Sequence, residues 1–145
     1  MEKNIVYQSI QGNIGLGKAI SYFVSNKIPI SIPLNDTQKY DLVAEINGKL
    51  QKVSVKTSRN SHKNSTSYSV QLRNTGGSSG KNKVRLFDKN DIDYLFIYTA
   101  DNKMYLIPSE IITVKNAITV GIKYTEYLVN EKSFSDFAND LENNS

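Results

Sequence analysis

Asn47 and Gly48 separate two runs of alternating apolar and polar residues, Tyr40 to Ile46 and Lys49 to Thr57. Asn-Gly is the preferred two-residue turn of a β-hairpin, because both of its positions require a positive φ. The pattern therefore predicts two antiparallel strands. With the turn placed there, Ile46 faces Lys49, and the numbers of paired residues sum to 46 + 49 = 95.

This register assigns side chains to the two faces of the hairpin, because successive residues of a strand point to opposite sides. Asp41 lies opposite Ser54 on one face, and Lys56 follows two residues further along the same face. A carboxylate beside an ammonium group can hold a divalent cation and stabilise charge on an attacked phosphate, or it can be a surface ion pair. The other face carries the apolar residues and is expected in the core: Leu42, Ala44, Val53 and Val55.

The remaining segments predict a mixed α/β protein with an antiparallel-rich sheet flanked by helices. We expect a single domain over residues 1–145, ending in a C-terminal helix and frayed tail over residues 130–145. Apolar spacing predicts a helix over Ile10 to Ser25, and Ser133 is placed to cap a short helix near the C-terminus. Further strands are expected at Ile28 to Leu34, Ser67 to Arg73, Asp93 to Thr99 and Lys103 to Ile107.

The net charge of +4 and the pI near 9.2 conceal an uneven distribution. The stretch from Lys49 to Phe87 holds nine lysines or arginines and no acid, so the remainder carries 9 basic against 14 acidic residues. A basic stretch of this kind favours a polyanionic partner, and double-stranded DNA is the partner we expect. The chain has no cysteine and a single histidine, which excludes disulfides, thiolate chemistry and a multi-histidine metal site.

No apolar run is long enough to span a membrane. The first residues also lack the apolar core of a signal peptide, so a cytoplasmic location is expected.

Several basic residues of the acid-free stretch are candidate DNA contacts. Those after Lys56 lie among hydroxyl and amide residues, a composition that suits phosphate contacts. Two arginines flank a glycine-rich loop and are the candidates for reading bases, since a guanidinium pairs with guanine through two hydrogen bonds. The candidates are Arg59, His62, Lys63, Arg73, Lys81, Lys83 and Arg85.

An ordered set of short motifs resembles the bacterial PD-(D/E)xK endonucleases related to group I intron homing endonucleases. The resemblance implies a restriction-endonuclease-like fold, Mg²⁺-dependent cleavage of double-stranded DNA, and action as a homo-oligomer, either a dimer or a tetramer. It extends from about Gln11 to Tyr127 and rests on Gly12-Asn-Ile-Gly15, Ser31-Ile-Pro-Leu34, Tyr40-Asp41-Leu42, Val53-Ser-Val-Lys56-Thr57, Asp93-Tyr-Leu-Phe96, Tyr98-Thr-Ala-Asp101, Met104-Tyr-Leu-Ile-Pro-Ser-Glu110 and Ile122-Lys-Tyr124.

The resemblance also implies roles for individual residues. Asp41 would bind the metal together with the backbone carbonyl of Val55, and Lys56 would position or polarise the attacking water. Two positions depart from the family's pattern: Ser54 stands at the second acidic position of the motif, and Leu16 stands where the first helix carries a glutamate. Asp36, in the loop before the strand, is the nearest candidate for a replacement carboxylate.

Three interpretations follow from this pattern of matches and departures. The first is a homing- or restriction-type endonuclease that needs Mg²⁺, or Mn²⁺ if the reduced set of ligands binds Mg²⁺ poorly. The second is a catalytically inactive DNA-binding pseudonuclease of a phage or mobile element, acting as a regulator or antagonist. The third is a basic module that binds an acidic protein.

Overall fold

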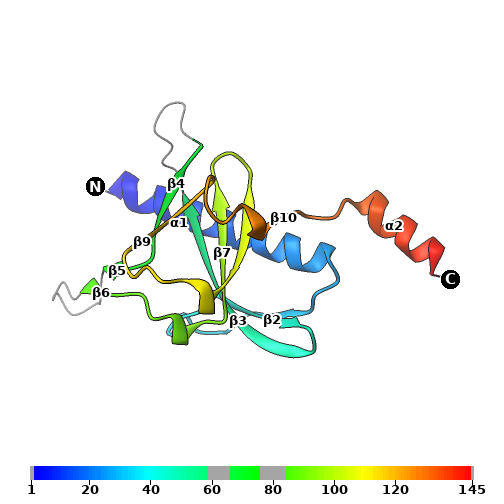
Figure 1. The fold of residues 1–145 in the computed structure, drawn as a ribbon, viewed down its shortest axis with the longest axis horizontal. Helices are drawn as coiled ribbons and strands as arrows, with labels where there is room; N and C mark the ends of the chain where they lie inside the picture. Colours follow the sequence, from blue (N-terminus) through cyan, green and yellow to red (C-terminus); the bar gives the residue numbers. More distant parts are fainter. Residues whose placement is uncertain (1, 59–65, 76–83, 145) are drawn as a thin grey trace.

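The chain folds around a central sheet with one long helix against it, as Figure 1 shows for the computed structural model. The structure describes residues 2–58, 66–75 and 84–144. The helices are α1 (Glu2–Ser25) and α2 (Phe134–Asn143), with 3-10 turns η1 (Lys89–Asp91), η2 (Ser109–Ile111) and η3 (Thr125–Tyr127). The strands are β1 (Ile30–Ser31), β2 (Leu42–Ile46), β3 (Lys49–Ser58), β4 (Tyr68–Gln71), β5 (Asn74–Thr75), β6 (Val84–Arg85), β7 (Tyr94–Thr99), β8 (Met104–Pro108), β9 (Ala117–Val120) and β10 (Leu128–Val129).

The predicted hairpin is confirmed in both position and register. β2 and β3 pair antiparallel with Leu42 opposite Val53, as the sum of 95 requires. Asn47 and Gly48 have φ values of 53° and 76°, the left-handed conformations that this turn demands. The local sequence alone therefore places Asp41 beside the middle of β3.

The main sheet has the order β1-β2-β3-β7-β8-β10 and is mixed. Its neighbouring strands are antiparallel except for β3 and β7, which run parallel from Val53 opposite Tyr94 to Ser58 opposite Thr99. The predicted fold class, an antiparallel-rich mixed sheet with flanking helices, is confirmed. Because β2 pairs with β3 only as far as Val53, residues 54–58 of β3 extend beyond their partner.

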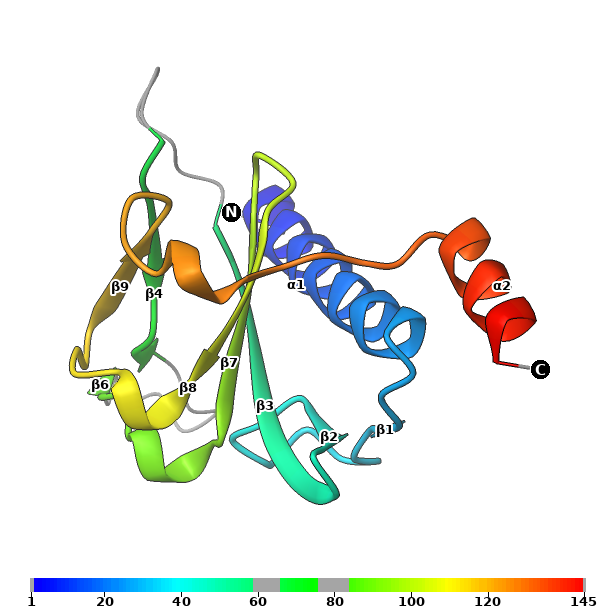
Figure 2. The same ribbon diagram turned by 45° about the vertical axis from the view of Figure 1, so that its right-hand side comes forward.

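A separate apolar core lies on each face of the sheet, and Figure 2 shows α1 on one side and β4 with β9 on the other. The α1 side is filled by the first core cluster, which includes Phe23, Leu42, Val53 and Phe96. The opposite side is filled by a second cluster: Tyr68, Val70, Leu72, Ile92, Leu95, Ile97, Tyr105, Ile107, Ile112, Ile118 and Val120. The faces predicted for the hairpin are thus correct, since Leu42, Ala44 and Val53 are fully buried.

Helix α1 begins at Glu2, eight residues before the predicted start at Ile10. Three glycines favoured a late start, because glycine weakens a helix interior. At Gly15 the glycine is a packing requirement, because a Cβ there would lie 2.4 Å from Cγ2 of Thr57 on β3. The absence of a side chain lets the helix approach the strand closely.

One further expectation needs correction, and one strand was missed. The strand predicted over Ile28 to Leu34 contains only Ile30–Ser31, because Pro33 has no N–H to donate and Leu34 is fully exposed. Strand β9 was not predicted, and its four residues pair antiparallel with β4.

The C-terminal helix α2 forms as predicted, with Ser133 at its N-cap. The Ser133 hydroxyl accepts the N–H of Asp136, whose carboxylate in turn accepts the N–H of Ser133. No residue of α2 is buried, and both ribbon views show the helix standing apart from the sheet (Figures 1 and 2). Within the described ranges, no helix combines the length and apolar character needed to cross a membrane.

Candidate functional site

Asp41 lies where β2 and β3 begin to diverge. Its N–H donates to the carbonyl of Val53 at 2.9 Å, and its Oδ2 accepts the N–H of Val55 at 2.6 Å. Along a strand inside a sheet, the backbone N–H and carbonyl groups of successive residues point in turn to the strand on one side and to the strand on the other. The carbonyl of Lys52 accepts the N–H of Asp93, so Lys52 points to the β7 side of β3. The N–H and carbonyl of Val55 therefore face the same edge as the Asp41 carboxylate.

Lys56 is half-buried and lies between two hollows, one on each side of its position along β3. Its face of the strand also carries Ser54 and Ser58, as the hairpin register predicts. The structure thus places Val55 and Lys56 on the part of β3 that extends beyond β2, and Asp41, just before β2, beside them. They are the residues to which the sequence resemblance assigns metal binding and activation of the water, and these roles stay a prediction.

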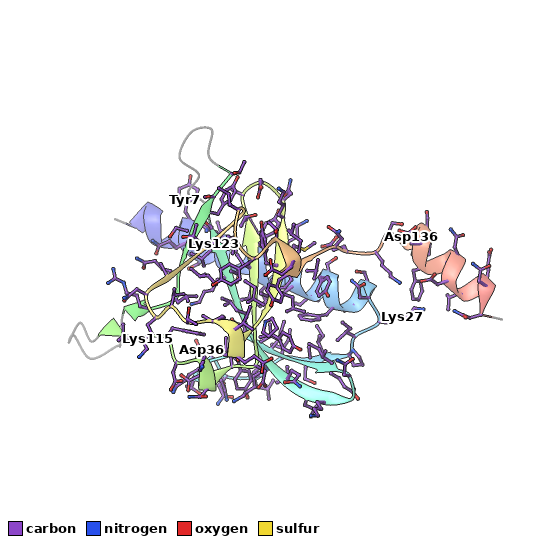
Figure 3. All side chains as sticks on the ribbon, in the orientation of Figure 1. Tyr7, Lys27, Asp36, Lys115, Lys123 and Asp136 are labelled. Atoms are coloured by element: carbon purple, nitrogen blue, oxygen red, sulfur yellow. The ribbon has the colours of Figure 1, made fainter. Side chains whose placement is uncertain are left out.

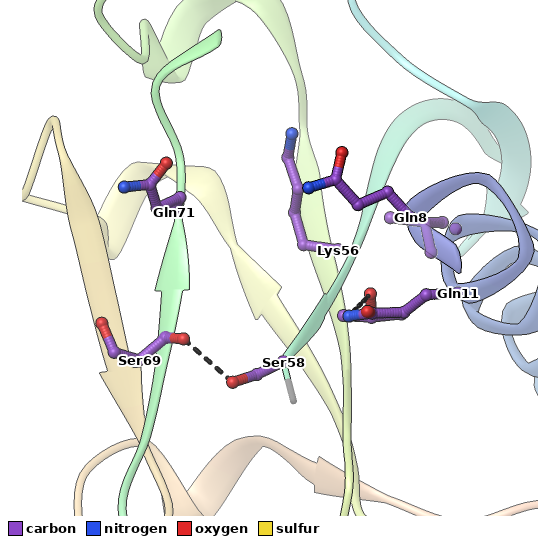
Figure 4. Close-up of a pocket in the computed structure, with 9 residues that line it drawn as sticks. Gln8, Gln11, Lys56, Ser58, Ser69 and Gln71 are labelled. Carbon is purple, nitrogen blue, oxygen red and sulfur yellow. Dashed lines mark hydrogen bonds between the residues drawn. The ribbon is translucent and has the colours of Figure 1, made fainter. Parts of the chain in front are cut away.

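The larger hollow beside Lys56, which we call the amide pocket, has a volume of about 410 Å³. Figure 4 shows Gln8 and Gln11 reaching it from α1, Lys56 and Ser58 from β3, and Ser69 and Gln71 from β4. Its remaining lining residues are Gly12, Val55 and Thr57, and none of the nine is acidic. The pocket presents one ammonium group together with amide and hydroxyl groups.

Two hydrogen bonds fix the walls of the amide pocket. The side-chain amide of Gln11 donates to the Thr57 hydroxyl at 2.7 Å, which links α1 to β3. The Ser58 hydroxyl donates to the carbonyl of Ser69 at 2.9 Å, which links β3 to β4 across the pocket (Figure 4). Both walls are therefore tied to the same strand that carries Lys56.

The glutamines of this pocket were not singled out from the sequence. Gln11 lies in the glycine motif of the resemblance, which gave a weak signal for its position. Gln8 and Gln71 had no signal, because only the tertiary packing of α1 and β4 against β3 brings them together.

Ser54 occupies a different environment from the one expected for a metal ligand. It is only 8% exposed and lines a small hollow together with Lys39 and Asp91, which form an ion pair at 3.0 Å. A serine hydroxyl also supplies no negative charge. The position at which the family pattern calls for an acid or amide is therefore nearly closed to solvent.

Leu16 is partly buried and packs against the first core cluster. Among the described residues, no group of three or more histidine, aspartate or glutamate side chains is placed to hold a metal ion. Asp36 is exposed in the loop before β2 (Figure 3). One carboxylate and one backbone carbonyl are the minimum of the donor set by which proteins usually hold Mg²⁺, which is one or two carboxylates together with phosphate oxygens of the substrate.

Most of the basic residues predicted to contact DNA lie outside the described residues: Arg59, His62, Lys63, Lys81 and Lys83. Arg73 is exposed just after β4, and its N–H donates to the carbonyl of Asn116 at 3.4 Å. The backbone of Arg85 belongs to β6 and pairs with Asn74 of β5.

Comparisons with known proteins agree with this geometry. Residues 7–139 match the model of the PD-(D/E)XK endonuclease family. The structure of a bacterial homing endonuclease, I-Ssp6803I, is similar with a TM-score of 0.71 and 23% sequence identity over 94% of each chain. At that identity the likeness concerns the fold. Among curated proteins, no sequence gives a significant match.

Proposed function

Because this chain belongs to the PD-(D/E)XK endonuclease family, we propose that it binds double-stranded DNA across the diverging edge of β3 and the amide pocket. We further propose that it cuts DNA slowly or not at all. The observation that carries the second part is the reduced donor set: Asp41 and Lys56 are in place, whereas Leu16 packs into the core and Ser54 is a nearly buried hydroxyl.

Charge and hydrogen-bonding chemistry support DNA as the partner. The amide pocket is lined by Lys56 and several amides with no acid, and such groups commonly contact phosphate and sugar. The stretch from Lys49 to Phe87, which includes β3, contains nine basic residues and no acid. A phosphodiester backbone can enter the amide pocket without meeting like charge from its lining residues.

The weak metal site argues against efficient cutting. In metal-dependent nucleases a bound Mg²⁺ offsets developing charge on the phosphate and activates a water molecule. Here Asp41 already accepts the N–H of Val55, so part of its acceptor capacity is used within the protein. Mn²⁺ accepts a wider range of ligands, so any residual cutting is expected to favour Mn²⁺ over Mg²⁺.

Nicking of supercoiled plasmid tests the catalytic part. The wild type, Asp41→Ala and Lys56→Ala are compared in Mg²⁺, Mn²⁺ and EDTA. We expect little or no nicking in Mg²⁺, and any nicking in Mn²⁺ should disappear in both variants. Rapid Mg²⁺-dependent nicking that Asp41→Ala abolishes would refute the proposed loss of cutting and identify the protein as an efficient endonuclease.

Binding to a fluorescent duplex in EDTA tests the DNA-binding part. Affinity should fall steeply with salt, and Arg73→Ala or Lys83→Ala should reduce the slope of that dependence by about one each. Absence of duplex binding at low salt would favour the remaining candidate, a basic module that binds an acidic protein. Binding without nicking supports a catalytically inactive DNA-binding protein that belongs to a phage or mobile element and acts as a regulator or antagonist.

We also propose that the protein forms homo-oligomers through the outer face of α1. Residues 5–17 contain no charged side chain, and Val6, Ile10 and Val24 are 56%, 49% and 58% exposed on that face. Exposed apolar surface without charge matches a second copy of itself better than it matches DNA or an acidic peptide.

A dimer or tetramer is expected in sedimentation experiments, and Ile10→Asp should shift it to monomer. A wild type that stays monomeric at all concentrations refutes this.

A further inference from the structure

The amide pocket continues into a second hollow of different chemistry, which we call the apolar groove. The groove has a volume of about 290 Å³ and is lined by Ile14, Tyr98, Thr99 and Ala100. Gln11, Thr57 and Ser58 line both hollows. A polar pocket containing Lys56 and a mainly apolar groove are therefore contiguous at the C-terminal ends of the parallel strands β3 and β7.

Tyr98 is held in place in the wall of the groove. Its side chain is on the α1 side of the sheet and packs against the first core cluster. The Lys18 ammonium lies 5.5 Å from the centre of its ring, and its hydroxyl donates to the Asn102 side chain. Contacts at the ring and at the hydroxyl restrict the side chain, so the groove is formed before any ligand binds.

We propose that the amide pocket and the apolar groove together form a subsite for one unpaired nucleotide. The nucleotide phosphate would lie among Lys56, Gln8 and Gln71, and its base would lie in the groove against Ile14 and Tyr98. This inference rests on the proposed DNA binding and adds which form of DNA the cleft prefers.

The chemistry of the two hollows favours a nucleotide whose base is out of the stack. Within an intact duplex the faces of the bases are covered by their neighbours, so the exterior offers phosphates, sugars and base edges. Phosphates alone would explain the amide pocket but leave the apolar groove without a partner. An unpaired nucleotide presents an anionic phosphate next to an apolar base face, just as the amide pocket lies next to the apolar groove.

The energetic comparison also favours DNA that is already distorted. Taking a base out of an intact duplex costs stacking and pairing energy, which is least for a base that is unpaired from the start. Contact between a base and aromatic or apolar side chains contributes a binding free energy similar in size to that cost, which corresponds to roughly tenfold or more in affinity. The subsite should therefore discriminate between probes that do and do not offer an unpaired base.

Three fluorescent duplexes test the proposal in EDTA: one fully paired, one with a single bulged nucleotide, and one with the same bulge lacking its base. We expect the wild type to bind the bulged nucleotide about tenfold more tightly than the abasic bulge. Tyr98→Leu keeps apolar volume against the core, and Ala100→Leu fills the groove without adding charge. Both variants should bring this ratio close to one, whereas Thr113→Leu, an exposed substitution elsewhere, should leave it unchanged.

The outcomes separate this proposal from the function on which it rests. If the wild type binds all three duplexes equally, the nucleotide subsite is refuted while DNA binding stands. The subsite is refuted as well if both groove variants are folded and keep the tenfold ratio. If the wild type binds no duplex at low salt, the proposed DNA binding fails and the subsite fails with it.

Discussion

Replacing Gly15 by alanine tests how closely α1 approaches β3. A Cβ at this position would lie 2.4 Å from Cγ2 of Thr57, whereas its other neighbours, Cγ1 of Val55 and Cβ of Thr57, lie at the ordinary contact distances of 3.5 and 3.8 Å. The clash therefore comes from a single methyl group. That methyl cannot rotate away without breaking the hydrogen bond from Gln11 to the Thr57 hydroxyl.

Two opposing terms set the size of the effect. Alanine favours the helix over glycine by about 0.5–1 kcal/mol. Insertion of a methyl group into a packed contact costs about 1–3 kcal/mol. We therefore expect Gly15→Ala to lower the free energy of unfolding by roughly 1 kcal/mol, which corresponds to a fall of about 3–4 °C in Tm for a chain of this size.

Thermal and urea unfolding of five proteins isolates the cost of this clash: the wild type, Gly15→Ala, Gly17→Ala, Thr57→Ser, and Gly15→Ala combined with Thr57→Ser. Gly17→Ala is the matched control, since a Cβ there meets no atom within 4 Å and should raise stability. Thr57→Ser removes the clashing methyl and keeps the hydroxyl, so Gly15→Ala should become neutral or stabilising in that background. The reasoning is refuted if Gly15→Ala stabilises the wild type as much as Gly17→Ala does.

Three further predictions concern the site, the core and the C-terminal helix. Leu16→Glu combined with Ser54→Glu should increase Mg²⁺-dependent plasmid nicking above the wild type, and adding Asp41→Ala should abolish the gain. If the folded double variant shows no gain, the missing acids are not the cause of weak cutting. Burial raises the pKa of Tyr22, so its protonated form stabilises the fold fully below pH 10, and this contribution is lost as the pH rises above 10. In urea titrations, the free energy of unfolding should therefore fall less between pH 9 and 11 for Tyr22→Phe than for the wild type. An equal fall in the two proteins would contradict this. Ser133→Ala should weaken α2 by about 1 kcal/mol, seen as faster hydrogen exchange in residues 134–143, while Tm stays unchanged because the helix buries no residue; a lower Tm would show that α2 supports the core.

The sequence was informative where the determining interactions are local. The Asn47-Gly48 turn and the alternation around it define the hairpin register and hence the positions of Asp41 and Lys56. Ser133 similarly defines the start of α2. These features depend on residues within a few positions of one another, so their physical causes can be recognised without knowledge of the fold.

Features that depend on tertiary packing were missed. The early start of α1 was not predicted, because Gly15 weakens an isolated helix while the contact with Thr57 requires it. Strand β9 is only four residues long and is stabilised by pairing with β4, far away in the sequence. The amide pocket was missed for the same reason, since Gln8 and Gln71 meet only after α1 and β4 pack on opposite sides of β3.

The loss of acids from the site has a consequence for binding as well as for cutting. The resemblance implies a site with two or three carboxylates and one lysine, which without metal has a net negative charge and repels a phosphate. In this chain Asp41 and Lys56 are the charged residues at the corresponding positions, so these positions together carry no net charge. One carboxylate about 5 Å from a phosphate costs roughly 3 kcal/mol at an effective dielectric constant of 20, and less where solvent screens it.

This difference predicts that DNA binding by the wild type is independent of divalent metal. Affinity for a duplex at fixed ionic strength should agree within about twofold between EDTA and Mg²⁺, because no repulsion has to be neutralised first. Leu16→Glu with Ser54→Glu should bind weakly in EDTA and recover in Mg²⁺, because the two added carboxylates repel phosphate until a cation offsets them. A wild type that needs Mg²⁺ to bind would show that Asp41 alone retains the ion, and the case for lost cutting would then fail at its first step.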